Sequence, residues 1–234
     1  MKKFFVALFF AISFLCALPV TSIAQEVGLS FSYFIPRNGH FAVPVSPFSY
    51  REVGINFNDY LSLETGFSVY LMPGLGVTDL PFEAEEPLMG PLVSLMVPLE
   101  LVLQFYLPNQ VIRIKAGGFG FYNIFSQIRE GNLDRAIADW QNLDVVTSNF
   151  DYDNLPGFGL MGGLKYIVYL QKNFGITLGV NYLLGNAPLN LNGSYLGGVT
   201  GGSVQNFTDV EFEESKLDFT GFEFSIGVLV GGGS

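Results

Sequence analysis

The sequence predicts an all-β fold: an eight-stranded antiparallel, up-and-down transmembrane β-barrel with short periplasmic turns and long extracellular loops. Three observations predict it. The 234 residues are 49% hydrophobic and only 14% charged, whereas soluble domains carry about 25% charged residues. Apolar residues alternate with small or polar ones in eight segments, which is the period of a β-strand. The links between these segments alternate between short and long, as in the hairpins of a membrane barrel.

The first 24 residues predict a cleaved export signal. Lys2 and Lys3 give a positively charged start and residues 4–18 are largely apolar. Ser22 and Ala24 place small residues where cleavage before residue 25 requires them. The apolar stretch is shorter than the roughly 20 residues of a membrane-spanning helix. We therefore expect two segments, a signal peptide at 1–24 and an outer-membrane barrel domain at 25–234.

The single cysteine, Cys16, lies inside this predicted signal. Bulky Leu15 precedes it, which argues against a lipid-anchored chain because a lipoprotein acceptor follows a small residue. After cleavage the domain has no cysteine, so the sequence excludes a disulfide framework and thiol chemistry.

Each of the eight predicted strands has one face of Leu, Val, Ile and Phe and one face of small or polar residues. They span 27–33, 52–57, 61–71, 93–105, 111–122, 159–171, 174–182 and 221–230. Within the fifth strand, Gly117 and Gly118 predict a β-bulge that shifts the alternation before Phe119 and Phe121. Each strand has about the length of a tilted bilayer crossing, although the second is marginal.

The predicted connections sort by length. Short ones lie at 58–60, 106–110 and 172–173, and long ones at 36–50, 73–90, 123–157 and 185–216. A soluble meander has no reason to sort its loops in this way, so the pattern favours a membrane barrel with all long loops on one side.

The polar strand faces distinguish a membrane barrel from a lipocalin-like soluble one, whose exterior would be dense in Lys and Glu. These faces are mostly Gly, Ser, Thr and Asn, with seven charged residues. The charged residues are Glu52, Glu64, Glu100, Arg113, Lys115, Lys165 and Glu223. Four acids and three bases can largely neutralise one another in a narrow lumen. We expect a structural ion-pair plug, with a gated ion path as the alternative.

Aromatic residues cluster near the predicted strand ends, as the interface girdles of membrane barrels do. The expected girdles contain Tyr33, Tyr50, Tyr70, Tyr122, Phe158 and Tyr182 at the loop side and Phe57, Tyr60, Phe105, Tyr106 and Phe174 at the turn side.

The export signal, the hairpin REVGINFNDYLSLETGFSVYLMP at 51–73 and the closing strand TGFEFSIGVLV at 220–230 carry a family resemblance. In these segments the chain resembles the eight-stranded outer-membrane barrels of the OmpA, OmpX and OmpW type and, more loosely, the PorT-like outer membrane β-barrel group. The resemblance covers nearly all of 25–230 and implies location in the cell outer membrane, in contact with lipid and lipopolysaccharide. In one respect the chain departs from the pattern: such barrels usually end on an aromatic residue, and this one ends on Val230 and Gly-Gly-Gly-Ser.

Some barrels of this kind modify lipid A with a His, a Ser and an acid near the outer rim. The only histidine is His40, in the first long loop, with Ser46 and Ser49 nearby. Their spacing does not place base and nucleophile within hydrogen-bond reach. We therefore expect no catalytic residues and no cofactor, and keep a lipid-modifying enzyme as the least favoured alternative.

A carrier or narrow channel for small apolar molecules is the stronger alternative. Phe, Leu and Pro recur in the loops at 41–48 and 75–82, where they would line a hydrophobic mouth or collapse against the rim. An eight-stranded barrel is about wide enough to be filled by its own side chains, so an open pore is not expected.

The long loops hold 14 of the 21 acidic residues and 4 of the 11 basic ones, a net charge of −10. This acidic surface, together with the overall negative charge, argues against nucleic-acid binding. Asp151 and Asp153 are weak candidates for a metal site, because the alternate oxygen ligands resemble the start of a calcium loop but the later Gly and Glu are missing.

Leu133, Ala136, Ile137, Trp140 and Leu143 recur at helical spacing in the third long loop. Trp140, the only tryptophan, is the candidate contact for a protein partner, with packing on the barrel rim as the alternative. The last long loop is expected to be mobile and no further domain is expected after the last strand. The sequence thus favours a non-enzymatic structural or surface-recognition element, or a subunit of an envelope assembly.

Overall fold

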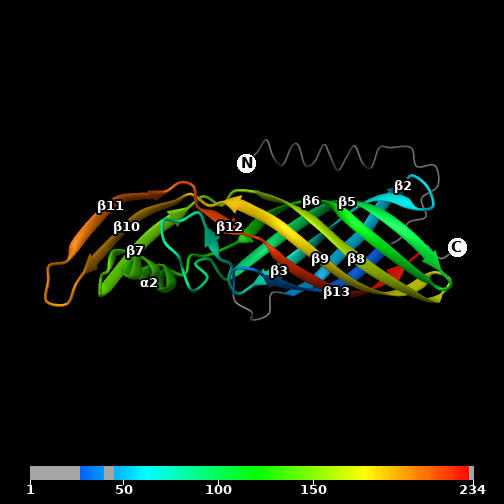
Figure 1. Cartoon of the computed structure of the whole chain (residues 1–234), viewed down its shortest axis with the longest axis horizontal. Helices are drawn as coiled ribbons and strands as arrows, with labels where there is room; N and C mark the ends of the chain where they lie inside the picture. Colours follow the sequence, from blue (N-terminus) through cyan, green and yellow to red (C-terminus); the bar gives the residue numbers. More distant parts are fainter. Residues whose placement is uncertain (1–26, 40–44, 232–234) are drawn as a thin grey trace.

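The computed structural model describes residues 27–39 and 45–231 and shows a closed barrel with a folded extension at one end (Figure 1). Each barrel strand pairs antiparallel with its neighbours, and β13 pairs with both β9 and β1, which closes the ring. The barrel strands are β1 (Val27–Pro36), β2 (Val45–Asn56), β3 (Leu61–Met72), β5 (Leu92–Leu107), β6 (Gln110–Phe125), β8 (Gly157–Gln171), β9 (Phe174–Pro188) and β13 (Gly221–Val230). The predicted eight-stranded up-and-down barrel is confirmed.

Three tight turns lie at one rim of the barrel, as the sequence predicts. They connect β2 to β3, β5 to β6 and β8 to β9. In the first, the Asn58 side-chain oxygen accepts hydrogen bonds from the backbone N–H groups of Tyr60 and Leu61. Val27 pairs with Val230, so the first and last strands begin and end at this same rim.

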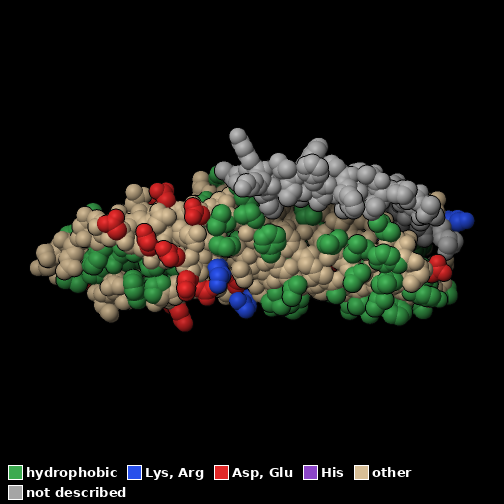
Figure 2. Space-filling model, turned by 90° about the horizontal axis from the view of Figure 1, so that it is seen from above, with side chains coloured by type: hydrophobic (Ala, Val, Ile, Leu, Met, Phe, Trp, Pro, Cys, Tyr) green, Lys and Arg blue, Asp and Glu red, His purple; other side chains and the backbone are tan. Residues whose placement is uncertain are grey.

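The exterior of the barrel is apolar. Outward-facing side chains from all eight strands are exposed, among them Leu29, Ile55, Phe67, Leu99, Leu101, Ile114, Leu164, Leu178 and Phe224. Figure 2 shows hydrophobic side chains spread over the barrel, whereas Asp and Glu gather on the extension and its junction with the barrel. Such an exterior is favourable only in contact with hydrocarbon, and a closed ring leaves no strand edge unpaired there.

The bulge predicted at Gly117 and Gly118 is wrong. The ladders of β6 with β5 and with β8 run through both glycines without a register shift. The alternation therefore continues, and Phe119 and Phe121 point into the barrel, where they are buried. A glycine pair permits a bulge but does not require one, and here the interior takes up the two rings.

The expected aromatic girdles are in place at the turn side, where Phe57, Tyr60, Phe105, Tyr106 and Phe174 are exposed. At the loop side Phe158 is exposed, and four of the five tyrosines are partly exposed. Tyr70 is the exception, because its side chain is fully buried inside the barrel.

The long loops fold into an extension that we call the headpiece, comprising residues 73–91, 126–156 and 189–220. It contains β4 (Val77–Thr78), α2 (Glu130–Gln141), β7 (Val145–Tyr152), β10 (Leu191–Gly198), β11 (Gln205–Phe212) and β12 (Lys216–Asp218). Strands β11, β10 and β7 form a separate three-stranded sheet. The last long loop, expected to be mobile, is thus largely a β-hairpin beyond the barrel (Figure 1).

The expected helix in the third long loop is α2, and it packs on β7. Its buried residues Leu133, Ala136 and Ile137 belong to a hydrophobic core that also contains Phe150 from β7 and Met96 from the barrel. The headpiece and the upper barrel therefore share one core. No helix in the described part of the chain is both long enough and apolar enough to span a membrane.

The apolar exterior predicts an asymmetric response to charge. Leu99, near the middle of β5 and facing outward, is expected to face the bilayer midplane. Leu99→Arg should lower the free energy of unfolding by about 2–4 kcal/mol. Val145→Arg, at an exposed headpiece position, is the control and should have little effect. Denaturant unfolding of protein folded into lipid vesicles measures both, and equal losses would contradict a lipid-facing barrel wall.

Candidate functional site

The barrel interior is the candidate site, because the structural, channel and carrier hypotheses all depend on what fills it. Described side chains occupy it in three layers. Val111, Ile167 and Leu229 form a small apolar cluster at the turn end. Charged and polar side chains fill the middle, and aromatic and methionine side chains fill the end next to the headpiece.

All seven charged residues named from the sequence lie in this middle layer, and all are buried. The structure adds an eighth that the sequence did not reveal, Arg51 of β2. The layer therefore contains four acids and four bases. A neutral set of paired charges is the arrangement that a buried site can hold, because an unpaired charge in a low-dielectric interior is costly.

Arg51 and Glu223 form the best-defined pair. The two terminal guanidinium nitrogens of Arg51 donate to Glu223 Oε2 and Oε1 at 3.1 and 2.8 Å. The Tyr70 hydroxyl and the Asn181 amide also donate to Glu223, and Arg51 Nε donates to Ser68 Oγ at 3.0 Å. Fork-shaped, charge-assisted contacts of this kind are stronger than neutral hydrogen bonds and fix the orientation of both groups.

A second set of ion pairs crosses the barrel. Lys165 of β8 pairs with Glu52 of β2, on the opposite wall. Arg113 Nη1 lies 3.7 Å from Glu52 Oε2 and 3.4 Å from Glu64 Oε1. Lys115 Nζ lies 2.9 Å from Glu64 Oε2 and 3.6 Å from Glu100 Oε2. Ion pairs thus join β6 and β8 to β2, β3 and β5 through the interior of the barrel.

A β-bulge in β2 supplies two neighbouring residues to this layer. The pairing of β2 with β3 shifts between Arg51 and Val53, and Glu52 has a backbone φ of 73°. This left-handed conformation is rare for a residue other than glycine, asparagine or aspartate. As a result the successive side chains of Arg51 and Glu52 both point inward. The bulge carries no local sequence signal, and this is why the sequence did not predict Arg51.

Aromatic rings close the headpiece end of the lumen. Phe219, in the short link between β12 and β13, is fully buried and lies among four other rings. Its ring centroid is 4.5 Å from Phe121, 5.0 Å from Phe34, 5.9 Å from Tyr70 and 6.0 Å from Phe119. We call these five residues the aromatic plug. Packed rings at such distances bury large apolar areas with defined geometry.

Glycines on the neighbouring wall make room for two of these rings. A Cβ atom at Gly159 or Gly185 would lie 2.6 Å from the Phe119 ring, and one at Gly157 would lie 2.2 Å from the Phe121 ring. Real Cβ atoms do not approach that closely. The small residues that predict a tight interior therefore serve the aromatic plug as well as the ion-pair layer.

Three ion pairs hold the headpiece loops together and to the barrel rim. Arg37 pairs with Asp218, Lys216 with Asp79, and Arg135 with Glu86. The hydrogen bond to Asp79 raises the pKa of the Lys216 ammonium. These pairs connect segments far apart in the sequence, so they define how the loops dock.

Two headpiece groups have shifted pKa values for different reasons. The backbone N–H of Thr200 donates to Asp144 and lowers the pKa of its carboxyl group. Burial raises the pKa of the Tyr195 hydroxyl. The hydrogen bond between Thr200 and Asp144 holds the loop that connects β10 to β11 at the tip of the hairpin. Tyr195 is buried in the covered face of the same sheet.

The remaining candidate residues do not come together. Trp140 lies on α2, 38% exposed, with its ring centroid 5.4 Å from Phe82 and 6.3 Å from Phe212. Trp140 thus packs on rings within the headpiece and not on the barrel rim, and a role in partner contact stays a prediction. Ser46 and Ser49 are buried in β2, where their hydroxyl oxygens are hydrogen-bonded to each other at 3.0 Å. His40 lies outside the described residues.

The metal candidates Asp151 and Asp153 lie at the end of β7. Asp153 accepts a hydrogen bond from Asn190 at 3.3 Å. In residues 27–39 and 45–231 there is no group of three or more His, Cys, Asp or Glu side chains placed to hold a metal ion. The arrangement therefore offers no metal-ligand set of which the two aspartates would be part.

The ion-pair layer predicts a large cost for removing one partner. Glu223→Gln leaves Arg51 buried without its carboxylate, and breaking a buried pair in this way costs about 3–5 kcal/mol. The double variant Arg51→Met, Glu223→Gln should recover part of that loss, because no unpaired charge remains. Glu86→Gln breaks an exposed pair and should cost about 1 kcal/mol or less. Denaturant unfolding measures all three, and a Glu223→Gln cost no larger than that of Glu86→Gln would contradict a structural role.

No protein-family model matches the chain, and no curated protein sequence matches it. Solved structures that are similar at low identity include two outer-membrane proteins. The outer membrane protein OprG from Pseudomonas aeruginosa is 12% identical, with 91% of this chain and all of that chain covered and a TM-score of 0.45. Ail, the attachment invasion locus protein of Yersinia pestis, is 12% identical, with 88% of this chain and 94% of that chain covered and a TM-score of 0.37. By its own strand order, filled interior and apolar exterior, the chain has the fold of an eight-stranded outer-membrane β-barrel.

Proposed function

We propose that the chain is an integral outer-membrane protein whose sealed barrel anchors a folded acidic headpiece at the cell surface. There it serves, without catalysis, as a recognition element or as a subunit of an envelope assembly. The observation that carries this proposal is the continuous filling of the lumen by the ion-pair layer and the aromatic plug, whose core extends into the headpiece.

The filled lumen favours an anchor over a channel. A conducting barrel needs a continuous aqueous path, and eight strands enclose a space that side chains fill. Here the Lys165 to Glu52 pair bridges opposite walls, and the aromatic plug lies between this layer and the headpiece. Both barriers would have to move before solute crossed.

The packing of the loop at 75–82 argues against the carrier alternative, which needs an open hydrophobic mouth. The expected hydrophobic mouth at 75–82 is instead packed against the shared core through Val77, Leu80 and Phe82, and Leu75 is fully buried. The loop has thus collapsed against the rim within its described residues. The other loop of the expected mouth, 41–48, lies partly outside the described residues.

The headpiece favours a role at a surface. It has its own sheet, helix and core, and it lies at the end of the barrel opposite the tight turns (Figure 1). Long elaborated loops of outer-membrane barrels are on the outer face and short turns on the periplasmic face. A folded acidic structure presented to the outside is suited to binding a partner.

The sealed lumen predicts an absence of conductance. In planar bilayers the purified protein should give no steady current above that of the lipid alone, since both barriers are built from packed side chains. A large porin, whose lumen is an aqueous channel, is the positive control. Reproducible unitary steps from the wild-type chain would contradict the anchor role and favour the channel alternative.

The orientation predicts which sites are reachable on intact cells. Val204 lies exposed at the headpiece tip and Lys172 lies in a tight turn at the opposite rim. In the full chain, Val204→Cys should react with a membrane-impermeant maleimide on intact cells, and Lys172→Cys should react only after the outer membrane is permeabilised. The reverse pattern would show that the headpiece faces the periplasm. Cleavage of the predicted signal would remove Cys16, so the introduced cysteine would be the only thiol that reacts with the maleimide.

A further inference from the structure

The three-stranded headpiece sheet has one covered face and one open face. Its inner face packs on α2 and the 73–91 segment, and its buried residues include Val146, Phe150, Tyr195 and Phe212. On β7 the alternate residues are exposed, in the order Val145, Thr147, Asn149 and Asp151. Cross-strand pairing places Asn192 beside Asp151 and Glu211. These residues belong to the open face, which no described segment covers.

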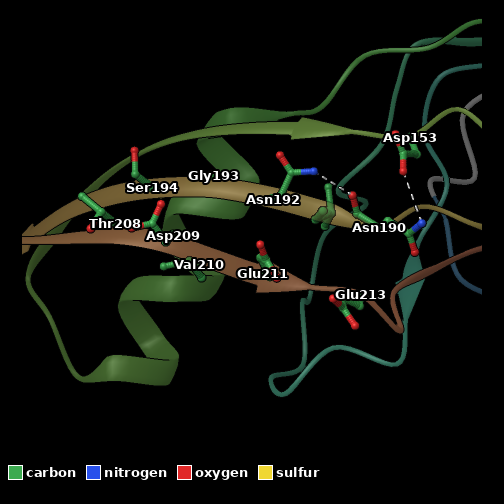
Figure 3. A pocket seen from close by; sticks show the side chains of 11 residues that line it. Asp153, Asn190, Asn192, Gly193, Ser194, Thr208, Asp209, Val210, Glu211 and Glu213 are labelled. Atoms are coloured by element: carbon green, nitrogen blue, oxygen red, sulfur yellow. Dashed lines mark hydrogen bonds between the residues drawn. The ribbon is translucent and has the colours of Figure 1, made fainter.

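An open depression of about 800 Å³ lies on this face, between β10 and β11. Figure 3 shows side chains from both strands and from Asp153, at the end of β7, around it. Its polar lining combines amides, hydroxyls and carboxylates, from Asn190, Asn192, Ser194, Thr208, Asp153, Asp209, Glu211 and Glu213.

None of the four carboxylates in this lining takes part in an ion pair of the headpiece, although Asp153 accepts a hydrogen bond from Asn190. The ion pairs of the headpiece engage Arg37, Lys216 and Arg135 with other acids. Arg129 donates to the backbone oxygen of Pro73. Within residues 27–39 and 45–231, no Lys or Arg forms an ion pair with Asp153, Asp209, Glu211 or Glu213. The depression thus presents uncompensated negative charge to a ligand.

A second observation on the same face is independent of the acids. Toward the tip of the sheet the side chains become apolar: Val145 is 65% exposed, Leu196 is 48% exposed and Val204 is 71% exposed. Leu196 pairs with Thr147, and Gly198 pairs with Val145, so these residues share the open face. Exposed apolar side chains that gather outside a membrane indicate contact with another molecule.

We propose that this open face docks an extended polypeptide segment that bears Lys or Arg together with apolar side chains. Asp209, Glu211 and Glu213 follow one another at every second position of the chain. Glu211 lies on β11, Asp209 lies at the register shift within this strand and Glu213 follows its last residue. A segment lying along β11 with its basic residues facing the sheet therefore brings positive charge close to all three acids. Its apolar residues then reach the tip.

The chemistry of the face favours this occupant over a metal ion. The described residues offer no cluster of ligands close enough to surround a cation, whereas amides and hydroxyls interspersed with carboxylates suit the donors of a peptide backbone and of ammonium or guanidinium groups. The inference rests on the proposed surface role of the headpiece and names the class of partner that it recognises.

The test measures binding of a labelled nine-residue peptide, KTKTKTVTV, to the full mature chain in nanodiscs of zwitterionic lipid. In an extended chain the lysines and valines of this peptide all point to the same face. The pocket variant is Asp209→Asn, Glu211→Gln, Glu213→Gln. Asparagine is chosen at position 209 because Asp209 has a backbone φ of 55°, a left-handed conformation that asparagine also adopts readily. The matched control is Glu83→Gln, Glu85→Gln, Asp139→Asn, which removes three exposed acids elsewhere on the headpiece. The pocket variant should bind about tenfold more weakly, the control within about twofold of wild type, and added salt should weaken wild-type binding.

Two further probes separate the parts of the proposal. A peptide with serine in place of valine should bind the wild-type chain more weakly if the apolar end of the face contributes. For the same reason, the lysine–valine peptide should bind the Leu196→Ser variant more weakly than the wild-type chain. A peptide with glutamate in place of lysine should not bind. Equal losses in the pocket variant and the charge-matched control would overturn the site, and so would undiminished binding of the serine peptide or no binding by the wild-type chain.

These outcomes are distinct from failure of the proposed function. If the lysine–valine peptide does not bind but the protein is non-conducting and its tip is labelled on intact cells, the partner class is wrong and the anchor role stands. If the protein conducts or the tip is shielded, the surface role fails whatever the peptide does.

Discussion

Closure of the backbone hydrogen-bond ring is the constraint on which the rest of this structure depends. In hydrocarbon an unpaired N–H or C=O group costs several kcal/mol, so the edges of β1 and β13 must meet. Closure with eight strands then fixes the width of the interior. The chain cannot leave that space empty, and any charged residue that it places there must be paired with an opposite charge. The three interior layers are the solution that this sequence adopts.

The two main layers solve different parts of that problem. The ion-pair layer joins walls that share no hydrogen bonds, since Lys165 and Glu52 come from opposite strands. It needs four bases to balance its four acids, and the bulge at Glu52 provides the fourth by turning Arg51 inward. The aromatic plug depends on glycines, because Phe119 occupies the space that side chains at Gly159 and Gly185 would take. A strained backbone position and a set of missing side chains are thus both consequences of filling one narrow lumen.

The sequence predicts the barrel well because period-two alternation and loop length follow directly from strand geometry and hairpin topology. Strand number, turn positions and the buried placement of the seven charged residues follow from those patterns. Two of the failures share one cause: they depend on whether a bulge forms, which a local pattern does not decide. The glycines at 117 and 118 permit a bulge that does not occur, and Arg51 enters the lumen through one that nothing marks. The β10–β11 hairpin is hidden by its glycines and by the register shift between Gly193 and Tyr195.

The charged residues of the headpiece fall into two groups: those that form ion pairs between its loops and those that form none. Its basic residues are engaged in joining the loops to one another and to the rim, through Arg37, Arg135 and Lys216. The acids of the open sheet face take no part in those ion pairs, and like charges that lie close together along one chain segment repel one another. Folding alone would therefore favour neutral residues at Asp209, Glu211 and Glu213. Their presence on the only sheet face left uncovered among the described headpiece strands is better explained by a positively charged partner than by the stability of the fold.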